Sequence, residues 1–181
     1  MGSPRSLVIF NPNGGRGRTA GLRPSVEGAL REAGVAFDAV ATTGPMDAER
    51  LAAAAPGKYD SVVSLGGDGT VHEIVNGLMR ASREGATLPL GIVPLGSGDD
   101  FAKMIPPEAA VGGRAYDWRS AIGKIARREI RPFDVGRVRI SPGGDDGVRY
   151  FVNNLDVGFA AVGAVNARTI PGLFKGTAAY L

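Results

Sequence analysis

Three glycine-rich segments carry the residues of this sequence that could do chemistry. They are Asn11-Pro12-Asn13-Gly14-Gly15, Gly66-Gly67-Asp68-Gly69-Thr70 and Pro94-Leu95-Gly96-Ser97-Gly98. Closely spaced glycines leave backbone N–H groups free to face an anion such as a phosphate. The Asp68 carboxylate could bind Mg²⁺ or accept a proton from a substrate hydroxyl, and the Thr70 hydroxyl could contact a phosphate. These residue types therefore point to phosphate chemistry.

Each segment also has a plainer interpretation. A single carboxylate in a loop is more often a turn residue or a helix cap, but a cap does not require the three glycines around Asp68. Another interpretation is a dinucleotide fingerprint, Gly15-x-Gly17-x-x-Ala20, with Asp38 as its acidic residue. Against this interpretation, Asp38 falls inside an expected strand instead of at its end. The other two glycine-rich segments would also be left without a role.

Alternating strands and helices must position these segments. Apolar runs predict buried strands at residues 7–10, 35–41, 61–65 and 90–93. Helices are expected at residues 19–33, 47–55, 100–104 and 116–128, and a further one after Thr70. That last helix has one apolar stripe, made of Val71, Ile74, Val75, Leu78 and Met79. The alternation predicts a Rossmann-like α/β fold with a parallel sheet and helices on both faces. Because ligands bind at the carboxyl ends of parallel strands, we expect the three segments at one edge.

The pattern changes after residue 129. Residues 131–140 and 148–157 read as two strands of a hairpin joined by a turn, and residues 158–168 as a helix. A two-stranded hairpin is not stable alone. The sequence therefore predicts an α/β domain at residues 1–129 and the beginning of an incomplete, β-rich second domain at residues 130–181.

Composition excludes several classes of function. The 181 residues are 44% hydrophobic and 22% charged, as expected for a globular chain. The absence of cysteine excludes disulfides and thiolate metal sites, and a single histidine, His72, excludes a histidine-rich metal site. A net charge of +3 gives no argument for nucleic acid. The apolar runs are shorter than the roughly 18 residues of a membrane span, so we expect a cytoplasmic protein.

Taken together, the motifs resemble the diacylglycerol kinase catalytic domain family, which includes YegS-like bacterial lipid kinases and sphingosine kinases. The matching motifs are Asn11-Pro12-x-x-Gly15, then Gly66-Gly67-Asp68-Gly69-Thr70-Val71-His72-Glu73-x-x-Asn76-Gly77-Leu78, then Pro94-Leu95-Gly96-Ser97-Gly98-x-Asp100-Phe101-Ala102. Thr42 resembles the family's threonine after the second strand. Residues 133–136, 153–159 and 172–181 resemble the family's second domain. The order and spacing of the motifs make this resemblance more specific than any one of them.

The resemblance implies a kinase that transfers the γ-phosphoryl of ATP, with Mg²⁺, to a hydroxyl of diacylglycerol or a related lipid. By similarity, the nucleotide would be held by Asn11, Pro12, Asn13, Gly14, Gly15, Thr42, Gly66, Gly67, Asp68, Gly69, Thr70, Val71, His72 and Ser97. Asp68 would be the catalytic carboxylate and the magnesium ligand. The implied partners are ATP and a lipid at a membrane surface, where the protein would be peripheral; nucleic acid is not among them.

Departures from the family pattern keep alternatives open. Asp99 stands where the family usually has Asn, and Ala160 where it usually has Asp. The family's second domain normally continues beyond residue 181 and supplies an acidic catalytic residue and the lipid cleft. One alternative is a nucleotide-binding module without catalysis. Another is an NAD-kinase-like enzyme, which shares Gly66–Gly69 but has neither the Asn-Pro opening nor the third segment.

Overall fold

A parallel sheet forms the centre of the structure, a computed structural model that describes residues 4–82, 86–105, 117–140 and 147–155. Its four strands are β1 (Arg5–Phe10), β2 (Ala36–Ala41), β3 (Ser61–Gly66) and β4 (Leu90–Pro94). Their order is β2-β1-β3-β4, and all neighbours are parallel. The predicted α/β fold is therefore confirmed.

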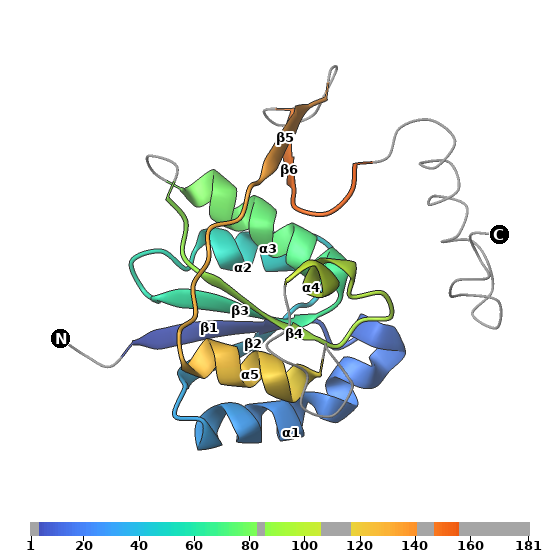
Figure 1. Ribbon diagram of the computed structural model, residues 1–181. Helices are drawn as coiled ribbons and strands as arrows, with labels where there is room; N and C mark the ends of the chain where they lie inside the picture. Colours follow the sequence, from blue (N-terminus) through green and yellow to red (C-terminus); the bar gives the residue numbers. More distant parts are fainter. Residues whose placement is uncertain (1–3, 83–85, 106–116, 141–146, 156–181) are drawn as a thin grey trace.

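Helices cover both faces of this sheet (Figure 1). One face packs against α1 (Arg18–Glu32) and α5 (Trp118–Ala126), and the other against α2 (Asp47–Ala53) and α3 (Asp68–Ala81). Neighbouring residues of a strand point to opposite faces, which explains the two hydrophobic cores. Val8, Val63 and Leu65 belong to the first, whereas Leu7, Ile9 and Val62 belong to the second. Two short helical segments complete this part: η1 (Gly14–Gly17) and α4 (Asp100–Met104).

The carboxyl ends of the four strands lie side by side. In the register of the sheet, Phe10 pairs with both Ala41 and Leu65, and Gly66 pairs with Pro94. Backbone bonds continue one residue further: Thr42 N–H donates to Phe10 O at 2.9 Å, and Leu95 N–H donates to Gly66 O at 3.1 Å. The segments that follow these strands therefore leave the sheet at one edge, as expected.

A hairpin of β5 (Gly136–Arg139) and β6 (Val148–Phe151) follows the α/β part and lies next to α3 (Figure 1). Its strands are antiparallel, which confirms the predicted hairpin with shorter strands. Val71 and Val75 of α3, together with Phe101, form a third hydrophobic core against Val135, Tyr150 and Val152. The helix expected at residues 158–168, Ala160 and the motif at 172–181 lie outside the described residues. Within the described ranges, no helix is long and apolar enough to cross a membrane.

Candidate functional site

A pocket of about 430 Å³ lies where the carboxyl ends of the strands meet. Its walls come from the loop after β1, the loop after β2, the first turn of α3 and the loop after β4. The lining residues are Asn11, Asn13, Gly14, Gly15, Thr42, Gly44, Pro45, Ala48, Gly67, Gly69, Thr70, Glu73, Gly96 and Ser97. The volume is in the range of pockets that bind small molecules and cofactors.

The sequence-based candidates divide into two groups. Those that line the pocket are Asn11, Asn13, Gly14, Gly15, Thr42, Gly67, Gly69, Thr70 and Ser97. Those outside its lining are Pro12, Gly66, Asp68, Val71 and His72. Val71 is 3% exposed and belongs to the third core, which explains its place in the motif without any ligand.

Five lining residues were not among the candidates: Gly44, Pro45, Ala48, Glu73 and Gly96. Gly96 lies inside the third segment, and Gly44-Pro45 follows Thr42 with only Thr43 between them, so their positions were a usable signal. Glu73 Oε2 accepts the Ala48 N–H at 3.1 Å and thereby ties the second turn of α3 to the start of α2. The sequence gives no signal for this contact, because it joins residues 25 positions apart.

Glycines allow the backbones of the three segments to lie in close contact. A Cβ on Gly96 would lie 2.5 Å from the Gly67 Cα, and a Cβ on Gly15 would lie 2.2 Å from the Leu95 carbonyl oxygen. Gly15 also has φ +55°, a conformation that side chains disfavour. Close approach of backbones is therefore a second reason for glycine here, besides exposure of N–H groups to a ligand.

Asp68, which lies outside the pocket lining, supports the start of a short helix. Its Oδ2 accepts the Asp100 N–H at 3.1 Å and its Oδ1 accepts the Phe101 N–H at 3.0 Å, at the start of α4. The Asp100 carboxylate itself accepts a hydrogen bond from Lys103 Nζ at 2.7 Å. A carboxylate has about four lone-pair positions, so Asp68 keeps acceptor capacity beyond these two bonds.

Asp99 adopts a left-handed backbone conformation just before α4, with φ 54°. Its Oδ1 accepts the Gly96 N–H at 2.8 Å. An Asn side chain offers the same acceptor, and both residue types tolerate this conformation, so this loop geometry suits either residue. Burial raises the pKa of Asp99, and the negative charge of Asp68 acts in the same direction.

The placement of Asp38 contradicts the dinucleotide interpretation. Asp38 pairs with Leu7 in the register of the sheet, three positions before the strand ends at Ala41. Its carboxylate binds the Arg5 guanidinium and accepts a hydrogen bond from the Tyr59 hydroxyl at 2.9 Å. These two bonds, that of Arg5 first, lower the pKa of Asp38. The Asp38 carboxylate is not part of the pocket lining. It is therefore not placed to bind the ribose of a dinucleotide in that pocket.

In the described part of the chain, no group of three or more His, Asp or Glu side chains could hold a metal ion alone. Magnesium in kinase sites is bound by one or two carboxylates together with phosphates and water. Asp68, with its remaining acceptor capacity, fits a magnesium ion of that kind.

Comparison with known proteins gives consistent results. The family model described as "Diacylglycerol kinase catalytic domain" matches residues 5–138. The Xanthomonas campestris protein named "Probable lipid kinase YegS-like" is 38% identical over 166 residues, which are 88% of this chain and 48% of that protein. The diacylglycerol kinase of Bacillus subtilis is 31% identical over 150 residues, which are 82% of this chain and 44% of that protein.

A solved structure leads to the same family. A crystal structure of a diacylglycerol kinase from Bacillus anthracis superimposes with a TM-score of 0.60 at 27% identity, covering 72% of this chain and 44% of that one. The chain thus spans about half the length of the bacterial relatives it matches.

Proposed function

This chain belongs to the diacylglycerol kinase catalytic domain family, and we propose that its pocket binds ATP for phosphoryl transfer to a lipid hydroxyl. The acceptor would be diacylglycerol or a related lipid at the surface of a membrane. One observation carries the proposal: three motifs far apart in the sequence line one pocket at the carboxyl edge of a parallel sheet. Ligands of open α/β sheets bind at this edge.

Phosphoryl transfer depends on positioning and on neutralising charge. Backbone N–H groups of the glycine-rich loops and the Thr70 and Ser97 hydroxyls would hold the phosphates. Asp68 would hold magnesium, which when bound neutralises phosphate charge. Asp68 is also our candidate for the catalytic carboxylate. Its two bonds to α4 fix the carboxylate in place before any ligand arrives.

The lipid would bind between this α/β part and a second domain. We propose that the boundary lies near residue 129 and that the β5–β6 hairpin opens the second domain, as the sequence pattern predicts. The contact of β6 with α3 supports this, because α3 also forms one wall of the pocket.

A transfer assay tests the proposal. The chain is incubated with γ-³²P-ATP, Mg²⁺ and vesicles that contain diacylglycerol, a sphingoid base or phosphatidylglycerol, and the extracted lipids are separated. We expect label in one of these lipids, and none when Mg²⁺ is chelated. Binding of ATP with no labelled lipid would favour the non-catalytic module, and binding of neither ATP nor lipid would refute the proposal.

A further inference from the structure

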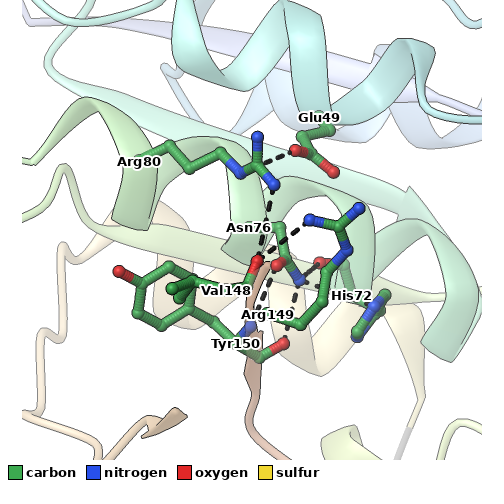
Figure 2. Close-up of polar contacts among 7 residues, drawn as sticks. All are labelled: Glu49, His72, Asn76, Arg80, Val148, Arg149 and Tyr150. Atoms are coloured by element: carbon green, nitrogen blue, oxygen red, sulfur yellow. Dashed lines mark hydrogen bonds and ion pairs between the residues drawn. The ribbon is translucent and has the colours of Figure 1, made fainter. Parts of the chain in front are cut away.

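Asn76 is a fully buried polar residue of α3 whose side chain contacts the backbone of β6 (Figure 2). Its Oδ1 accepts the Tyr150 N–H at 3.0 Å, and its Nδ2 donates to the Tyr150 carbonyl at 2.9 Å. Nδ2 also donates to the His72 carbonyl at 2.9 Å. One side-chain amide thus satisfies both backbone groups of a residue 74 positions away.

Arg80 repeats this contact one turn further along the helix. Its Nη2 lies 3.5 Å from the Val148 carbonyl, and its Nε pairs with Glu49 Oε1 of α2 at 3.1 Å (Figure 2). Residues four apart on a helix are about 6 Å apart along its axis, and alternate residues of a strand are separated by nearly the same distance. The face of α3 therefore matches the edge of β6 that points away from β5.

This arrangement covers a strand edge with a helix. Both backbone groups of a strand residue point to the same side, so those of Tyr150 point toward α3 and away from its partner Arg137. An uncovered strand edge can slip in register or pair with other chains. The two bonds to Asn76 fix which strand residue faces which helix residue.

The same helix reaches the pocket. Gly69, Thr70 and Glu73 in the first turns of α3 line it, and Asn76 lies about 10 Å further along the helix axis than Gly69. A single helix therefore joins the pocket to the hairpin, and Asn76 supplies two of the hydrogen bonds that attach the hairpin to it.

We propose that Asn76 is a positioning residue, which attaches the β5–β6 hairpin to α3 in one register and so sets its location relative to the pocket. The consequence for phosphoryl transfer rests on the proposed function, whereas the attachment itself does not. If Asn76 only stabilised the fold, its replacement would instead loosen the whole structure. It would then have no selective effect on kcat over KM.

Three variants separate these roles. Asn76→Leu keeps the branching at Cγ and the number of side-chain heavy atoms but removes both bonds to Tyr150. Asn76→Asp keeps the acceptor for the Tyr150 N–H and places a carboxylate oxygen against the Tyr150 carbonyl. Asn154→Asp makes the same chemical change at an exposed position on the segment after β6 and is the matched control.

Hydrogen exchange on the 181-residue chain tests the attachment. In both Asn76 variants we expect amides of residues 148–152 to exchange at least about tenfold faster, while those of β1 and β3 stay within about twofold of the wild type. Asn154→Asp should match the wild type. Unchanged exchange in residues 148–152, or an equal increase in β1 and β3, would overturn the proposal.

Kinetics test the positioning. In the transfer assay we expect kcat of both Asn76 variants to fall at least about tenfold, with KM for ATP within about twofold, because the pocket is intact. If an Asn76 variant shows fast exchange at residues 148–152 but keeps the kcat of the wild type, the positioning role is refuted. If the wild-type chain labels no lipid, the proposed function fails, while the exchange result still decides the attachment.

Discussion

At the scale of single residues, Asp68 shows why a motif residue need not have one role. Its carboxylate holds the start of α4 through the N–H groups of Asp100 and Phe101, so a change to alanine would disturb a helix as well as any metal or catalytic role. Loss of activity in Asp68→Ala would therefore not assign the chemistry. A position that lines the pocket without supporting the fold is a better probe.

Asp99 gives a prediction that depends on pH. Its pKa is raised in the folded state by burial, so its contribution to stability is fully present below pH 3.8 and is lost as the pH rises through the raised value. Asn at this position keeps the acceptor for the Gly96 N–H without a charge. We expect Asp99→Asn to have a higher free energy of unfolding than the wild type at pH 7, and the difference to shrink toward pH 4.

Urea unfolding at the two pH values measures this difference. Asp100→Asn makes the same chemical change at the neighbouring exposed position and is the matched control. If Asp99→Asn is less stable than the wild type at pH 7, the negative charge of Asp99 stabilises the fold and the prediction is wrong.

At the scale of elements, Gly77 sets how closely α2 and α3 pack. A Cβ on Gly77 would lie 2.2 Å from the Glu49 carbonyl oxygen, whereas a Cβ on Gly28, in the middle of α1, would meet no atom within 4 Å. Helix propensity alone favours alanine at both positions by up to about 1 kcal/mol. We expect Gly77→Ala to lower the free energy of unfolding by about 1–3 kcal/mol and Gly28→Ala to leave it equal or higher.

Urea unfolding of both variants decides the point. Their opposite signs would show that contact between backbones, and not helix propensity, requires glycine at position 77. Equal stabilisation of both variants would contradict the close packing of α2 on α3.

The elements themselves could be predicted because their signals are local. The apolar stripe of α3 and the buried runs of the strands each fall within a short window, and the parallel topology follows from their alternation. The glycine-rich segments could be placed at one edge for the same reason. Contacts between distant residues could not be predicted: Asp68 capping α4 and Asn76 holding β6 leave no periodic pattern.

At the scale of the whole molecule, the sheet brings four separate loops to one edge and α3 connects that edge to the hairpin. The α/β part holds the complete lining of the pocket within the described residues. We therefore expect it to bind nucleotide without help from any further part of a longer protein, even though the chain spans about half of its bacterial relatives.

The most direct test is the affinity for ATP with Mg²⁺, measured by calorimetry for the wild type, Gly69→Ala and Gly28→Ala. Both glycines lie in helices, and a Cβ at either meets no atom within 4 Å, but only Gly69 lines the pocket. We predict that the wild type and Gly28→Ala bind ATP with affinities within about twofold, and that the methyl group of Gly69→Ala weakens binding at least about tenfold. Equal affinities of the two variants, or no binding by the folded wild type, would contradict the assignment of this pocket to ATP.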